Sequence, residues 1–132
     1  MKHLLSIESL NRDEIYDILE LGDSMKASRG THSHQPLEDQ CWALIFSKSS
    51  TRTRVSFEVG IRELGGKVMF LSATDIQLGR GEPIEDTARV MGRMLHGAVI
   101  RTYQQSDVDL FAKYSGDMSF CMSFFKGSNC LK

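Results

Sequence analysis

The sequence predicts an α/β fold, an open parallel sheet of about four strands with helices on both faces. Short apolar runs alternate along the chain with segments in which apolar residues recur at helical spacing. The resulting order is helix, strand, helix, strand, helix, strand, helix. The run CWALIF at 41–46 is continuously apolar and bounded by polar residues, which is typical of a strand buried on both faces.

Length, charge and cysteine content limit the classes of function to consider. The 132 residues are enough for one domain with a moderate core. Sixteen basic and seventeen acidic side chains are mixed along the chain, so we expect neither nucleic acid nor a membrane surface as partner. No window approaches the roughly 18 to 20 apolar residues of a membrane span, and we expect a cytoplasmic protein. Three cysteines without C-x-x-C spacing favour neither a disulfide framework nor a metal site.

The first helix is expected over residues 11–27. Asn11 and Glu14 have the spacing of a capping box, and apolar residues recur at helical spacing from Ile15 onward. A segment containing glycine and proline then interrupts the pattern. The strand at 41–46 follows this break.

The second helix is expected to begin near Thr53 and to end before Gly65 and Gly66, because glycine commonly terminates helices. The apolar run KVMFL at 67–71 predicts the second strand. The polar segment SATDIQLGRGEP, punctuated by glycine, predicts a loop after this strand.

A third helix is expected over 83–95, because a proline at its start suits the first turn. The run GAVIRTY at 97–103 predicts the third strand. Ser106 and Asp109 have the spacing of a helix cap, so we expect a fourth helix that continues through Tyr114.

The stretch SKSSTRTR directly follows the first predicted strand. Ser49, Ser50 and Thr51 are therefore expected in a strand-to-helix turn at the carboxyl edge of the sheet, where such folds bind ligands. A helix N-terminus offers unpaired N–H groups, hydroxyls add donors, and Arg52 adds a guanidinium that can grip two oxygens. The pattern predicts a phosphate or carboxylate site. In the alternative interpretation, the hydroxyls only cap the helix and the arginines are solvated.

Arg101 leaves the carboxyl end of the third predicted strand, at the same edge as the hydroxyl cluster. Two such groups converging predict one site for a small, doubly charged ligand. An ordinary surface charge at the end of a strand is the alternative. The stretch has no G-x-x-x-x-G-K-[ST] pattern, so it is not a P-loop for nucleotide hydrolysis.

Three motifs in register carry a resemblance to a known family. SSTRTRVSFEVG resembles the signature of the aspartate and ornithine carbamoyltransferases, and DIQLGRGEPIEDTARVMGRM and GAVIRTY follow in that family's order and spacing. The resemblance covers roughly residues 1–115. The ornithine branch is the better match, because Lys48 lies two residues before Ser50 and the loop lacks the serine-rich stretch of aspartate enzymes.

The resemblance implies roles for particular side chains. The residues implied in binding carbamoyl phosphate are Ser50, Thr51, Arg52, Thr53, Gln77 and Arg101. Arg52 and Arg101 would be catalytic, acting near the carbonyl oxygen. Gln77 would enter the site of a neighbouring subunit in a homotrimer. Lys48 would add positive charge nearby, and Arg54 would anchor the loop structurally.

The implied reaction transfers the carbamoyl group of carbamoyl phosphate to the side-chain amine of ornithine, giving citrulline and phosphate. Negative charge grows on the carbonyl oxygen as phosphate leaves, so fixed cationic donors stabilise the transition state without a metal or cofactor. Aspartate as the acceptor is a less favoured alternative. A noncatalytic anion-binding or subunit-association module is another.

Members of this family are considerably longer, and a second domain binds the amino-acid acceptor. Its motifs do not occur here, so we expect a truncated chain that supplies the carbamoyl phosphate-binding half and is poorly active alone. We assign residues 1–116 to this incomplete domain and 117–132 to a tail that does not align with the family. The loosely alternating MSFCMSFF within the tail could still fill a strand position.

Overall fold

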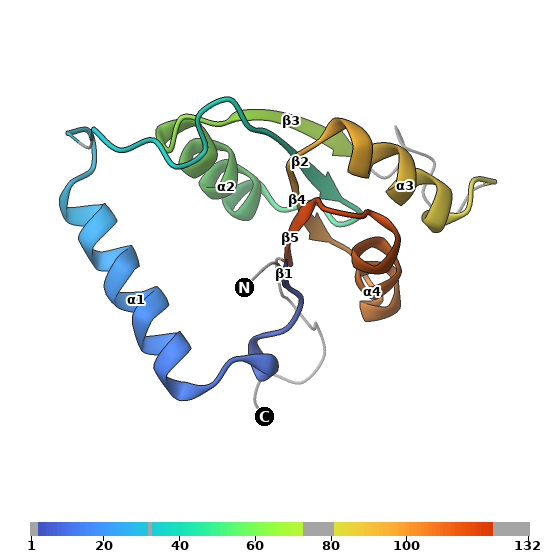
Figure 1. The fold of residues 1–132 in the computed structure, drawn as a ribbon, viewed down its shortest axis with the longest axis horizontal. Coiled ribbons are helices and arrows are strands. Elements are labelled where there is room, and N and C mark those ends of the chain that lie inside the picture. The colour runs from blue at the N-terminus through green and yellow to red at the C-terminus, as the bar shows by residue number, and fades with distance from the viewer. Residues whose placement is uncertain (1–2, 32, 73–80, 123–132) are drawn as a thin grey trace.

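The computed structural model describes residues 3–31, 33–72 and 81–122 (Figure 1). They form a five-stranded sheet in the order β1-β5-β4-β2-β3, in which every pair is parallel. The strands are β1 (His3–Leu4), β2 (Cys41–Phe46), β3 (Lys67–Ser72), β4 (Gly97–Arg101) and β5 (Ser119–Met122). The helices are α1 (Arg12–Ala27), α2 (Thr51–Glu63), α3 (Ile84–Met94) and α4 (Gln105–Tyr114), and the 3-10 turn η1 spans Ile7–Ser9. The predicted α/β class with a parallel sheet is confirmed.

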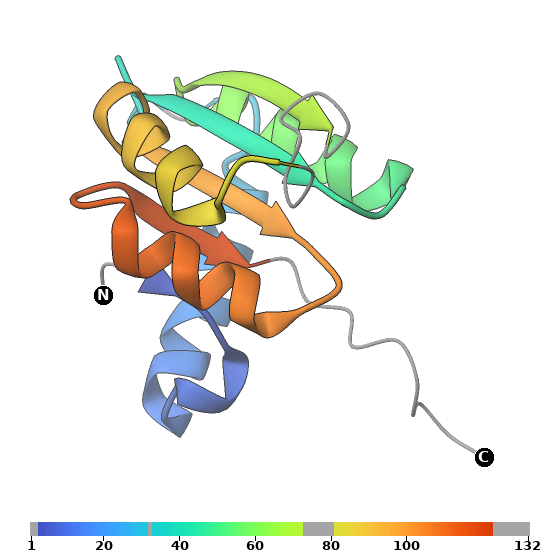
Figure 2. The same ribbon diagram turned by 90° about the vertical axis from the view of Figure 1, so that its right-hand side faces the viewer.

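The carboxyl ends of the three longest strands, β2, β3 and β4, lie side by side. β2 is flanked by β3 and β4, and Phe46 at its end is in register with Ser72 on one side and Arg101 on the other. The arrows of β2, β3 and β4 point the same way in Figure 2. Any loop that follows β2 is therefore placed between the ends of β3 and β4.

The two faces of the sheet bury alternate residues of the same strands. On one face, Leu44 and Val99 pack with Ile61 of α2. On the other, Ile45 and Ile100 belong to a cluster with residues of α3 and α4. Figure 1 shows α2 on one side of the sheet and α3 and α4 on the other. Helices on both faces are thus confirmed, and the continuous apolar run at 41–46 reflects burial on both sides.

Helix α1 differs from the others because it contains no buried residue. It extends away from the sheet in Figure 1. Asn11 caps it as predicted, with its side chain accepting from the Glu14 N–H and the Glu14 carboxylate accepting from the Asn11 N–H. Beyond its C-terminus, Arg29 pairs with Glu63 of α2 at 2.8 Å. The prediction of this helix is confirmed, although it covers neither face of the sheet.

Two helix starts differ from the prediction. α2 begins at Thr51 rather than near Thr53, because the chain is still extended at Ser50 and turns helical directly after it. The expected cap of the fourth helix by Ser106 and Asp109 is wrong. An N-cap must precede the first helical turn, whereas Ser106 already lies inside α4 and Gln104 is the capping residue.

Both ends of the described chain contribute strands to the sheet. β5 pairs with β4 on one side and with β1 on the other. The strand position considered for the tail is therefore occupied by residues 119–122. β1, with two residues, is a strand that the apolar pattern did not reveal. In the described parts of the chain, no helix combines the length and apolar character needed to cross a membrane.

Candidate functional site

The N-terminus of α2 lies at the carboxyl edge of the sheet, directly beyond β2. Ser50 precedes the helix in an extended conformation, and its side chain makes no capping hydrogen bond. Its hydroxyl instead donates to Oγ1 of Thr53 at 2.9 Å. The interpretation in which the hydroxyls serve only as caps is therefore wrong for Ser50.

Arg101 reaches the same helix turn from the end of β4. Its Nη1 donates to Oγ1 of Thr53 at 2.8 Å, across 48 residues of sequence. The Arg101 side chain is partly buried between the strand end and the helix. The structure thus brings together the two groups that the sequence placed at one edge, and surface solvation does not describe this arginine.

Thr53 connects the two groups. Its Oγ1 accepts from Ser50 and from Arg101, so the proton of its own hydroxyl is available for donation. This hydroxyl lies in the first turn of α2, at the positive end of the helix dipole, and contacts a guanidinium. We call the residues Ser50, Thr51, Arg52, Thr53 and Arg101 the anion cup. Its donors and positive charge suit a phosphate or carboxylate group.

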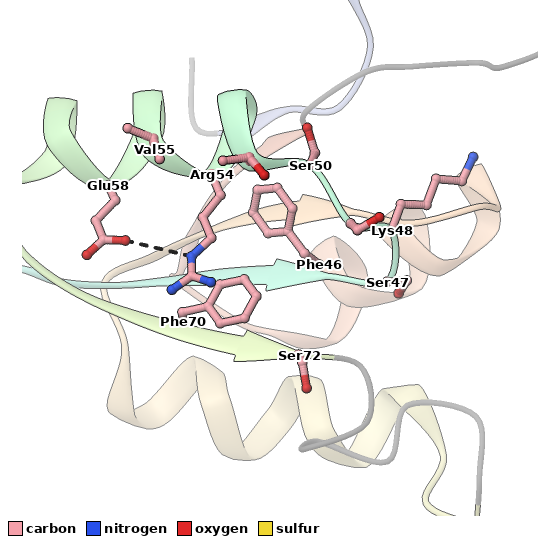
Figure 3. A pocket seen from close by; sticks show the side chains of 11 residues that line it. Phe46, Ser47, Lys48, Ser50, Arg54, Val55, Glu58, Phe70 and Ser72 are labelled. Carbon is pink, nitrogen blue, oxygen red and sulfur yellow. Dashed lines mark ion pairs between the residues drawn. The ribbon is translucent and has the colours of Figure 1, made fainter.

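A cavity of about 520 Å³ opens on the β3 side of the anion cup. Its lining includes every residue from Phe46 to Thr51, together with Arg54, Val55, Glu58, Phe70 and Ser72 (Figure 3). Hydroxyl groups therefore face this space from the β2–α2 turn, and aromatic rings form its floor. The cavity meets the cup at Ser50 and Thr51, whereas Thr53 and Arg101 do not line it.

Arg54 forms one wall of this cavity. Its guanidinium carbon lies 3.8 Å from the centroid of the Phe70 ring, and its Nε lies 3.8 Å from Oε2 of Glu58. Figure 3 shows the guanidinium between these two side chains. Glu58 also pairs with Arg62 at 3.3 Å. Arg54 thus contacts a residue of its own helix and a ring of β3, and its expected role as an anchor of the loop stays a prediction.

The remaining predicted residues are placed differently. Lys48 lines the cavity, but its Nζ lies 4.1 Å from the centroid of the Tyr103 ring. Arg52 is exposed on the first turn of α2 and does not line the cavity. Gln77 lies outside the described residues.

Tyr103 contacts the cavity residue Lys48, and the sequence did not single it out. It lies two residues beyond the end of β4, at the edge where the other site residues gather. It is the last residue of the run GAVIRTY that the sequence predicted as a strand, so its place at the carboxyl end of that run was the available signal. Glu58 and Phe70 were also missed, because only the packing of α2 against β3 brings them to the cavity.

Side chains that ligate metals do not gather in the described parts of the chain. In residues 3–31, 33–72 and 81–122, no group of three or more His, Cys, Asp or Glu side chains is placed to hold a metal ion. The polar groups that converge on the cup are hydroxyls and a guanidinium. These are donors that bind anions.

The chain is similar to curated ornithine carbamoyltransferases. It is 70% identical to the enzyme of Akkermansia muciniphila over 116 residues, which are 88% of this chain and 38% of that protein. The corresponding enzyme of Campylobacter fetus is 55% identical over 117 residues, again 88% of this chain and 38% of the relative. The chain therefore spans little more than a third of the length of these relatives.

Solved structures show the same similarity. The anabolic ornithine carbamoyltransferase of Campylobacter jejuni superposes with a TM-score of 0.85 at 39% identity, covering 94% of this chain and 39% of that one. The catalytic subunit of M. jannaschii aspartate transcarbamoylase has a TM-score of 0.82 at 30% identity, covering 93% and 42%.

A family model described as "Aspartate/ornithine carbamoyltransferase, carbamoyl-P binding domain" matches residues 2–126. This match includes the α2 turn, both strand ends that flank it, and strand β5. With such coverage, and with the relatives above, the chain belongs to the aspartate/ornithine carbamoyltransferase family and corresponds to its carbamoyl-P binding domain.

Proposed function

We propose that this chain binds carbamoyl phosphate as one half of an ornithine carbamoyltransferase. The single observation that carries the proposal is the convergence of Arg101 and Ser50 on Thr53 at the N-terminus of α2. This cluster offers hydroxyl donors, a guanidinium and a helix dipole to one anion. The match to the carbamoyl-P binding domain supports the same ligand.

In the proposed mode of binding, the phosphate group occupies the helix N-terminus and is held by Ser50, Thr51, Arg52 and Thr53. Arg101 lies at the β4 side of this position and donates to the carbonyl oxygen of the carbamoyl group. As the amine of ornithine attacks the carbamoyl carbon, charge builds on that oxygen and the bond to phosphate breaks. Donors already fixed before the reaction stabilise this charge without further reorganisation.

The acceptor and the assembly also belong to the proposal. Ornithine is favoured because the curated relatives that are 70% and 55% identical to this chain over the matched 116 and 117 residues are named ornithine carbamoyltransferases. We propose that the acceptor is held by the part of the protein that this chain does not span. We also propose a homotrimer, in which Gln77 of each subunit enters the site of a neighbouring subunit. A cytoplasmic location completes the proposal. The boundary at residue 116 stays a prediction.

Calorimetric titration of the chain with carbamoyl phosphate tests this function directly. We expect saturable binding that inorganic phosphate competes away. Replacing Arg52 with alanine should weaken it about 10- to 100-fold, since a hydrogen bond to a charged group contributes roughly 1.5–3 kcal/mol. Arg93→Ala is the matched control, because Arg93 is exposed at the end of α3 and outside the cup. A folded chain that does not bind carbamoyl phosphate would refute the proposal.

Thr53→Val tests the central hydroxyl with little change in side-chain shape. It removes the oxygen that Ser50 and Arg101 share. We expect affinity for carbamoyl phosphate to fall about 10-fold, the equivalent of roughly 1.4 kcal/mol. Ser56→Ala serves as the control, because the Ser56 hydroxyl only donates to the Thr53 carbonyl oxygen within the same helix. Equal affinities for Thr53→Val and the unaltered chain would show that Thr53 is outside the binding site.

Citrulline formation distinguishes an enzyme half from a noncatalytic binding module. A chimera can join this chain to the remaining part of the Akkermansia muciniphila relative, which is 70% identical over the shared region. We expect it to form citrulline from carbamoyl phosphate and ornithine and to use aspartate poorly. Binding of carbamoyl phosphate without turnover in a folded chimera would favour the noncatalytic alternative.

A further inference from the structure

We propose that Tyr103 is a positioning residue that holds the Lys48 ammonium group away from the anion cup and releases it when phosphate binds. The inference rests on the proposed function, because it concerns how that site captures its anion. It assigns a role to Tyr103 and a switching role to Lys48. The chemistry involved is competition for one cation between an aromatic face and a phosphate dianion.

The position of Lys48 is the first observation. The residue belongs to the lining of the cavity beside the cup. In Figure 3, however, its side chain points away from Ser50 and Arg54. The ammonium nitrogen lies 4.1 Å from the centroid of the Tyr103 ring, a distance typical of a cation–π contact. The ammonium group of Lys48, a residue that lines the cavity beside the cup, thus contacts the Tyr103 ring.

The backbone holds the two partners together. The Ser47 N–H donates to the Arg101 carbonyl at 2.8 Å, which ties the start of the β2–α2 turn to the end of β4. Beyond Arg101, the Thr102 hydroxyl donates to Asp107 of α4 at 2.7 Å. Lys48 follows the first of these contacts and Tyr103 follows Thr102. These hydrogen bonds therefore fix the positions of Lys48, after β2, and of Tyr103, after β4.

The contact between Lys48 and Tyr103 is weak enough to be reversible. The Tyr103 side chain is 71% exposed. At exposed sites, a cation–π contact changes an equilibrium constant by a factor of roughly 2 to 5, whereas a hydrogen bond to a charged group contributes roughly 10- to 100-fold. A phosphate dianion in the cup therefore outcompetes the ring for the ammonium group. The flexible stem of lysine allows the exchange without movement of the backbone.

Titration with inorganic phosphate tests this exchange. If the ring competes with the anion, Tyr103→Leu should bind phosphate about 2- to 5-fold more tightly than the unaltered chain. Tyr103→Phe retains the aromatic face and should bind like the unaltered chain. Lys48→Met should bind more weakly, and in that background Tyr103→Leu should have no further effect. Because Tyr103 is exposed, its replacement should leave the fold intact, and thermal unfolding of each variant checks this.

Lys113→Met is the matched control for loss of a lysine. Lys113 also lies over a tyrosine, with its Nζ 5.1 Å from the centroid of the Tyr114 ring, but it belongs to α4 and not to the cavity. Its removal should leave phosphate affinity unchanged. A decrease equal to that of Lys48→Met would mean that general charge, rather than the position of Lys48, governs binding, and would overturn the inference.

NMR supplies a second measurement that does not depend on affinity. The ε-methylene protons of Lys48 should resonate upfield in the phosphate-free chain because of the ring current of Tyr103. They should move downfield as phosphate saturates the site. An upfield position that persists at saturation, or equal or weaker phosphate binding by Tyr103→Leu, would overturn this inference alone. Absence of phosphate binding by the unaltered, folded chain would instead refute the proposed function, and this inference with it.

Discussion

Replacing Arg101 with alanine is expected to weaken binding of carbamoyl phosphate about 10- to 100-fold, since each charge-assisted hydrogen bond contributes roughly 1.5–3 kcal/mol. The substitution removes the proposed donor to the ligand and also the 2.8 Å hydrogen bond from Arg101 to Thr53. In the chimera, turnover should fall further, by about 10²- to 10³-fold, because the lost donor acts on charge that develops during the reaction. Titration calorimetry and a citrulline assay measure the two effects.

Arg101→Lys separates charge from geometry. Lysine keeps the positive charge but has no planar fork that can donate to Thr53 and to the ligand at once. We expect partial recovery of binding and little recovery of turnover. Arg93→Ala again controls for loss of an exposed charge. Unchanged affinity and turnover in Arg101→Ala would remove this residue from the proposed site.

The largest expected effect on stability comes from Gly92→Ala. Gly92 lies in α3 where the helix meets the end of α4, and a Cβ built there would collide with the carbonyl group of Ser115, only 2.6 Å from its carbon. Backbone atoms cannot rotate away as a side chain can, so the two helices must separate. Overpacking of this kind costs about 3 kcal/mol. Thermal or urea unfolding should show a clear loss of stability.

Gly60→Ala is the matched control within another helix. Gly60 lies in α2, and a Cβ there would have no atom within 4 Å beyond its own helix. Alanine in a helix interior is favoured over glycine by about 0.5–1 kcal/mol, so this variant should be slightly more stable than the unaltered chain. If Gly92→Ala proved as stable as Gly60→Ala, α3 and α4 would not pack as closely as described.

The positions of the elements were predictable, while some of their ends were not. Short apolar runs located the strands at 41–46 and 67–71 to within one residue, because strands inside a covered parallel sheet are rich in apolar residues. The start of α4 was misplaced because Ser106 is a favoured cap residue in general. In this turn, the end of β4 and the hydrogen bond from Thr102 to Asp107 determine where the helix begins. The general preference for serine as a cap residue does not override them.

By itself, the sequence determined the α/β class, the parallel sheet, and the location of the hydroxyl- and arginine-rich turn beyond β2. These features depend on local composition and spacing, which the chain carries in each segment. The tertiary structure alone decided that Arg101 contacts Thr53 and that Lys48 lies over Tyr103. It also placed β5 between β4 and β1. These arrangements depend on which strands pair and in what register, and no local pattern encodes a contact between segments about fifty or more residues apart.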